Sequence, residues 1–102
     1  MRDSPQARLA ELRERFRQRA IVDRTALSEL ASSLDKNAAV DVHAEDVRRI
    51  AHRLAGAGGT FGFPGISACA AELETLVSTS TSPEELAAGC TTLVLEIDRV
   101  LG

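Results

Sequence analysis

The sequence predicts an all-α protein in which amphipathic helices pack as an antiparallel bundle. Apolar residues recur at spacings of three and four along most of the chain, no segment shows the alternation of a strand, and short polar stretches separate the periodic segments. Helices of about 15 to 20 residues with short connections bury their apolar stripes best when they pack antiparallel around one core. A chain of 102 residues, 44% of them hydrophobic, suits one domain, and we assign residues 1–102 to it.

The first third of the chain predicts helices over residues 5–21 and 23–35. Their apolar stripes consist of Leu9, Leu12, Phe16 and Ala20, and of Leu27, Leu30 and Leu34. Asp23 lies where the two stripes meet. It either caps a second helix, stapled by Val22 and Leu27, or is a polar residue within one long or kinked helix. The sequence leaves both alternatives open.

The next helix is predicted over residues 44–61. Residues 35–43 break the apolar period and contain turn-forming residues, so Asp41 or His43 is expected to cap this helix. We interpret His43 as a cap or surface residue. The segment "GFPG" at 62–65 ends the helix, and Pro64 is well placed to open another one. The apolar face of that following helix consists of Ile66, Cys69, Ala70, Leu73, Leu76 and Val77.

The last helix carries a clear start signal. Ser82 is expected as the N-cap, Pro83 as the first helical residue, and Glu85 as the partner that completes a capping box. Its apolar stripe follows as Leu86, Cys90, Leu93, Ile97 and Val100.

Arginines are concentrated in the first quarter of the chain, although the formal net charge is −3. They are Arg2, Arg8, Arg13, Arg15, Arg17, Arg19 and Arg24. Acidic residues lie among them and no aromatic residues interleave, which indicates solvated helix faces rather than a nucleic-acid-binding arm. We therefore expect no nucleic-acid partner.

Several other classes are disfavoured by the sequence. No apolar run approaches the roughly 20 residues of a membrane helix, and the charged N-terminus lacks the apolar core of a signal peptide, so we expect a cytoplasmic protein with no membrane partner. Cys69 and Cys90 lie on apolar stripes without CxxC spacing, which indicates reduced core cysteines rather than a disulfide or a metal site.

His52 lies on the polar face of the helix at 44–61, within "RRIAHRLAGAGGTFGF". At about 100° per residue, the apolar stripe of that helix points roughly 140° to 180° away from His52. The stripe consists of Val47, Ile50, Leu54, Ala57 and Phe61. Within roughly 60° of His52 lie Arg48, Arg49, Ala55, Gly56 and Gly59. The imidazole is therefore expected to face solvent, with small residues on its downstream side that let another protein approach.

Gly58 points away from His52, so its small size has another cause. Either a neighbouring helix approaches closely at this point, or the helix simply tolerates a glycine there.

An exposed imidazole can act as a nucleophile at neutral pH, because its ordinary pKa is about 6.5. Attack on phosphorus would leave the ring phosphorylated, and Arg48 and Arg49 could hold the dianion; their alternative role is that of a solvated helix surface. No catalytic partner lies within sequence reach. Glu72 and Glu74 are expected to face solvent, with a hydrogen bond to the active region as the alternative. Catalytic groups would then come from a partner.

The stretch "AHRLAGAGGTFGF" at 51–63 resembles the signature of histidine-containing phosphotransfer (HPt) domains, especially the phosphotransfer module of chemotaxis histidine kinases. The matching positions are His52, Leu54, Gly56 and Gly62. The small residues Ala57 and Gly58 also suit the pattern, and the upstream apolar residues Phe16 to Leu34 fit the family across most of the chain.

The resemblance implies an up-down antiparallel four-helix bundle in which His52 carries a phosphoryl group between phospho-aspartates of receiver domains, without kinase activity of its own. The expected partners are a response regulator receiver domain and a hybrid histidine kinase. The receiver domain is expected to supply Mg²⁺, and no cofactor is expected on this chain. Receivers of the family dock beside the histidine, here on Ala55, Gly56, Gly59 and exposed parts of the helix after Pro64. A closed four-helix bundle needs no second subunit, so we expect a monomer.

One position departs from the family pattern, because the lysine that follows the histidine by three residues is Ala55 here. A cation near the phosphoryl group is therefore missing. Arg48, Arg49 or Arg53 could replace it, with Arg53 the least favoured because adjacent helix positions diverge by about 100°. The competing hypotheses are a helical interaction module that binds a receiver or kinase without phosphorylation of His52, and a small metal-dependent or hydrolytic enzyme, for which the ligand sets are missing.

Overall fold

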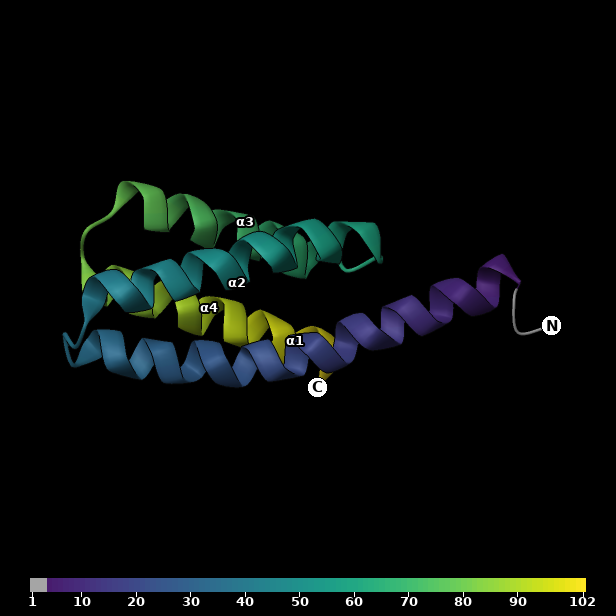
Figure 1. The fold of residues 1–102 in the computed structure, drawn as a ribbon, viewed down its shortest axis with the longest axis horizontal. Coiled ribbons are helices and arrows are strands. Elements are labelled where there is room, and N and C mark those ends of the chain that lie inside the picture. Colours follow the sequence, from purple (N-terminus) through teal and green to yellow (C-terminus); the bar gives the residue numbers. More distant parts are fainter. Residues whose placement is uncertain (1–3) are drawn as a thin grey trace.

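The computed structural model describes residues 4–102, so Arg2 and Asp3 lie outside the described residues. Four helices run alternately up and down and pack side by side, and residues 4–102 contain no strand (Figure 1). The helices are α1 (Pro5–Asp35), α2 (Val40–Thr60), α3 (Pro64–Thr79) and α4 (Pro83–Leu101). The predicted all-α four-helix bundle is confirmed.

Helix α1 is continuous through Asp23, which decides between the two alternatives that the sequence left open. Its N-cap is Ser4, whose Oγ accepts a hydrogen bond from the Ala7 backbone N–H at 3.1 Å. Asp23 therefore caps nothing; its side chain is 2% exposed and accepts from Arg53 of α2 at 2.6 Å. The N-terminal part of α1, purple in Figure 1, extends beyond the other three helices and gives the molecule its 52 Å length.

Helix α2 begins at Val40, four residues before the predicted start, and the prediction that Asp41 or His43 caps it is wrong. The N-cap position is Ala39, in the left-handed region at φ 44°, and no side chain caps it. Both predicted caps lie inside the first turn. There the Asp41 carboxylate faces the positive end of the helix dipole, while Nδ1 of the half-buried His43 lies 2.7 Å from the Ala38 carbonyl oxygen.

Helices α3 and α4 both begin at the predicted prolines. Ser82 caps α4, because its Oγ accepts from the Glu85 backbone N–H at 3.2 Å. The predicted capping box is wrong in its second half. The Ser82 N–H donates to Ser80 Oγ at 3.1 Å, and Ser80 Oγ donates to Glu85 Oε2 at 2.6 Å. A serine therefore stands between the two groups that a capping box would join directly.

The core lies between the apolar stripes of the four helices and continues to the α2–α3 turn. Phe63, at the end of that turn, stacks on Phe16 of α1 with ring centroids 4.9 Å apart. Cys90 is buried and Cys69 half-buried, and both are free thiols. On α2, the buried part of the predicted stripe is Val47, Ile50 and Leu54, while Ala57 and Phe61 remain partly exposed. The bundle thus fixes which side of α2 meets the core and which side meets solvent.

Candidate functional site

The imidazole of His52 stands on the solvent side of α2, as the helical periodicity predicts. Its side chain is 72% exposed. The neighbouring positions Ala51 and Leu54 are buried in the core, so α2 cannot turn the ring inward without exposing apolar side chains. The ring is therefore held at the surface by the packing of its own helix.

Glu74 of α3 forms a hydrogen bond with His52, so the expectation that Glu74 faces solvent is wrong and the alternative is right. His52 Nδ1 and Glu74 Oε2 lie 2.7 Å apart. An ionised carboxylate only accepts hydrogen bonds, so Nδ1 carries the proton and donates. This assignment leaves Nε2 with its lone pair on the exposed side of the ring, since a neutral imidazole has one protonated nitrogen. Glu72 is exposed, as expected.

The residues downstream of His52 leave open space, but the reason for a glycine differs from one position to the next. A Cβ added at Gly56 would meet no atom within 4 Å, so this position keeps the approach to the imidazole clear. A Cβ at Gly59 would lie 3.3 Å from Ser67 Oγ. The same Ser67 hydroxyl donates to the Ala55 carbonyl oxygen at 2.5 Å and ties α3 to α2. Gly59 therefore also gives room to Ser67.

Gly58 is buried where α3 begins, and close approach explains it. A Cβ at Gly58 would lie 3.2 Å from the Ser67 backbone nitrogen and 3.3 Å from the Phe63 carbonyl oxygen. Of the two explanations that the sequence left open, the structure supports close helix contact. The glycine-rich segment thus combines an open surface at Gly56 with a tight helix crossing at Gly58.

Arg48 lies on the His52 side of α2, one turn upstream. Its guanidinium donates to both carboxylate oxygens of Glu45, from Nε at 3.1 and 3.0 Å. The pKa of Arg48 is raised, first by the hydrogen bond with Glu45 and further by the charges of Glu45 and Glu74. Arg48 and His52 are one helical turn apart on the same face of α2, and Glu74 of α3 contacts that face at His52.

The other two arginines face α1 instead. Arg49 donates to Asp46 at 2.9 Å, and both line a shallow hollow with residues of α1. Arg53 donates to the buried Asp23 of α1 at 2.6 Å. The pair with Asp23 joins Arg53 to α1, and Arg49 lines the hollow next to α1, so Arg48 is the one of these three arginines that remains on the His52 side of α2.

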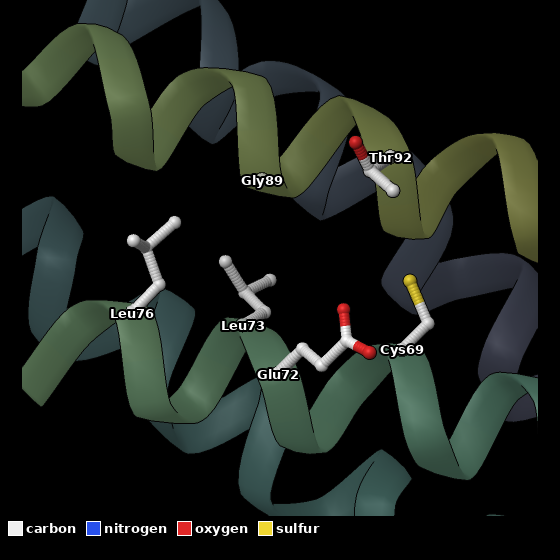
Figure 2. Close-up of a pocket in the computed structure, with 6 residues that line it drawn as sticks. All are labelled: Cys69, Glu72, Leu73, Leu76, Gly89 and Thr92. Carbon is white, nitrogen blue, oxygen red and sulfur yellow. The ribbon is translucent and has the colours of Figure 1, made fainter.

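A hollow of about 240 Å³ between α3 and α4 is lined by the half-buried Cys69 and the exposed Glu72, among others (Figure 2). Burial raises the pKa of the Cys69 thiol, and the charges of Glu72 and Glu96 raise it further, so the thiol is a poor nucleophile at neutral pH. Among residues 4–102, no group of three or more His, Cys, Asp or Glu side chains is arranged to hold a metal ion. His52 is therefore the better nucleophile of the two.

Comparison with known families decides the class of the protein. The family model described as the Hpt domain matches residues 6–102. The chain belongs to the Hpt family. Hpt domains work with histidine kinases and receiver domains in phosphorelays, as phosphocarrier modules rather than kinases. No curated protein and no solved structure matches this Hpt chain. In the part of the Hpt chain that the structure describes, no helix is long and apolar enough to cross a membrane.

The sequence left two features of this Hpt domain undecided. The Glu74–His52 contact joins residues 22 positions apart on antiparallel helices, and the separation of Arg48 from Arg49 and Arg53 depends on ion pairs with other side chains. The only available signal for Glu74 was its place on a helix expected to follow α2 after a tight turn.

Proposed function

We propose that His52 accepts a phosphoryl group on Nε2 from a phospho-aspartate of a receiver domain and passes it to another receiver aspartate, in a cytoplasmic phosphorelay. The observation that carries the proposal is the imidazole itself: 72% exposed, and held through Nδ1 by Glu74 at 2.7 Å. A ring held in this way presents the lone pair of Nε2 to an incoming protein.

The transfer step needs no general base on this chain, because no proton has to be removed from the ring. The Nε2 lone pair forms the bond to phosphorus while the bond from phosphorus to the aspartate oxygen breaks, and the carboxylate leaves with that electron pair. The Nδ1 proton stays on the ring, which becomes positively charged, and the adjacent Glu74 carboxylate stabilises that charge. The reverse step returns the phosphoryl group to an aspartate.

We propose that the partner receiver domain supplies Mg²⁺, which would neutralise charge on the phosphoryl oxygens during transfer. The residues of this chain contribute the nucleophile and its orientation. The domain then has no kinase activity of its own and works as a monomeric carrier between a hybrid histidine kinase and a response regulator.

The negative charge of the phosphoryl group favours a nearby cation. Because Ala55 occupies the position of the family lysine, another residue must supply that cation. Arg48 is the favoured replacement, since it lies one helical turn before His52 on the same face of α2. Either arginine would have to leave a carboxylate partner to contribute, Arg48 from Glu45 and Arg49 from Asp46. We propose that a receiver docks over the open surface at Ala55, Gly56 and Gly59, where the space above Gly56 admits a partner's loops.

The test is incubation with a phosphorylated receiver domain, followed by measurement of acid-labile label on the chain. The wild type is expected to take up label and His52→Gln to take up none. His43→Gln is the matched control, because it removes the other histidine and should leave uptake unchanged. Label on His52→Gln equal to the wild type would refute the proposal. Stable receiver binding without transfer in the wild type would instead support the interaction module.

A further inference from the structure

A second surface of interest lies between α1 and α2, where the bundle leaves an apolar hollow of about 190 Å³. Its floor consists of Leu12, Phe16, Leu54, Ala57 and Phe61. The hollow is concave and small, so it can take a large apolar side chain from a partner rather than a flat surface.

Three arginines surround this hollow: Arg15, Arg19 and Arg53. No acidic side chain lines it. Asp23 pairs with Arg53 at 2.6 Å and with Arg19 at 3.3 Å, so it balances one of the three charges and restrains two of the guanidiniums. Arg15 is exposed, and the rim keeps a net positive charge.

The N-terminal part of α1 extends beyond the other three helices (Figure 1). Leu9 is 46% exposed and lies three residues before Leu12, so the apolar stripe of α1 leads from the hollow into solvent. The N-terminal part of the chain, which includes this stripe, is also more positively charged than the rest. Residues 1–20 contain six arginines and three acidic residues, a net +3, whereas residues 21–102 contain six basic and twelve acidic residues, a net −6.

We propose that this hollow and the adjoining stripe of α1 bind an acidic amphipathic helix of a protein partner. An apolar side chain of that helix fills the space above Ala57, and flanking carboxylates contact Arg15 and the other rim arginines. Two copies of this chain would bring two positive α1 segments together, which disfavours a second copy as the occupant. A lipid surface is disfavoured because the apolar floor is recessed between helices.

This binding is separate from the chemistry proposed for His52. The hollow lies on the side of α2 that faces α1, whereas the imidazole is held by Glu74 toward α3. A partner helix in the hollow leaves Nε2 of His52 accessible, so the partner can anchor a kinase or regulator while phosphoryl groups are exchanged.

The probe is a helical peptide of about 18 residues with leucines spaced three and four apart and glutamates flanking them, and its binding to the full chain is measured by fluorescence anisotropy. Two matched peptides carry lysine in place of glutamate, or alanine in place of leucine. We expect the acidic leucine peptide to bind at least about tenfold more tightly than either, with an affinity that falls as salt rises.

Variants localise the contact. Arg15→Glu should weaken the acidic peptide about tenfold or more, whereas Arg17→Glu, an equal charge change at an arginine that lies outside the hollow and pairs with Glu14, should change it about twofold at most. Ala57→Phe, which fills the hollow without changing charge, should also weaken binding, with a thermal melt as the check on folding. Phosphotransfer to His52 serves as a separate readout and should be unchanged by Arg15→Glu.

Several results would overturn the proposal: equal binding of the three peptides, equal losses for Arg15→Glu and Arg17→Glu, or normal binding to Ala57→Phe. Self-association that Arg15→Glu abolishes, without peptide binding, would assign the surface to a second copy. Binding to vesicles of anionic phospholipid that Arg15→Glu abolishes, again without peptide binding, would assign it to a membrane. Slower phosphotransfer in Arg15→Glu would place the hollow within the transfer interface instead.

Discussion

His52 of α2 and Glu74 of α3 are joined by a hydrogen bond of 2.7 Å between Nδ1 and Oε2. This contact fixes the ring orientation and leaves Nε2 toward solvent, because a neutral imidazole carries its single proton on the nitrogen that the carboxylate holds. It links the exposed imidazole to α3 by one side chain.

Removal of the Glu74 carboxylate should therefore slow phosphoryl transfer with little effect on stability. Glu74→Ala should lower the rate about tenfold to a hundredfold, because a hydrogen bond to a charged group contributes about 1.5–3 kcal/mol. Glu74→Gln keeps an acceptor for Nδ1 but loses the charge, so an intermediate rate is expected. Rapid-quench transfer from a phosphorylated receiver measures the rates, and a wild-type rate in both variants would contradict the role assigned to Glu74.

The arginines on α2 should differ in their effects. The double variant Arg48→Ala with Arg49→Ala is expected to slow transfer about fivefold to tenfold while the fold stays intact. Most of this loss should appear in Arg48→Ala alone, since Arg49 lines the hollow next to α1. The transfer rates of the two single variants show how the loss is divided between Arg48 and Arg49, with circular dichroism as the folding control. An unchanged rate in the double variant would remove both residues from the site.

Two glycines of the same helix should respond in opposite directions to alanine. Gly58→Ala should destabilise the bundle by about 1–3 kcal/mol, because the new methyl group meets the Ser67 backbone nitrogen at 3.2 Å and the Phe63 carbonyl oxygen at 3.3 Å. Gly56→Ala should stabilise it by about 0.5–1 kcal/mol, since the methyl group meets nothing and alanine favours the helix. Urea denaturation measures both. Equal effects of the two substitutions would show that close packing is not what distinguishes them.

Among the charged residues of α1, Asp23 should cost the most stability when it is substituted. Its side chain is 2% exposed, Oδ2 has no hydrogen-bond partner, and Arg53 depends on it. We expect Asp23→Ala to cost about 1–3 kcal/mol, less than for a fully buried pair, because Arg53 is 37% exposed. The control is Asp46→Asn, which breaks an exposed pair and should cost less than about 0.5 kcal/mol. A smaller cost at Asp23 than at Asp46 in urea denaturation would contradict this assignment.

Acid should lower the stability of the bundle, in part because it protonates Asp98 of α4. Its hydrogen bond with Arg24 of α1 holds the pKa of Asp98 below the ordinary value of 3.8. Because the folded-state pKa is the lower one, the pair contributes stability above about pH 3.8 and loses it as the pH falls through the folded-state value. Asp98→Asn should thus be less stable than the wild type at neutral pH and approach it in acid. A difference independent of pH in denaturation curves would exclude this linkage.

The sequence could predict the helices because each one carries its own evidence. The apolar period of three and four gave the buried face of α2, and Pro64 and Pro83 marked the starts of α3 and α4, since proline suits the first turn of a helix. The sequence could not predict where α2 begins. Ala39 adopts a left-handed conformation that no local signal favours, and no side chain caps the helix there.

By itself the sequence determined the helical fold class, the solvent-facing position of His52 and the small residues beside it, because all of these follow from periodicity along one helix. Only the tertiary structure decided that Glu74 holds the imidazole, that Arg49 lines a hollow with residues of α1, and that α1 runs unbroken through a buried Asp23. These features depend on which side chains of different helices meet. That is set by how the helices rotate and slide against one another, a degree of freedom that no single helix encodes.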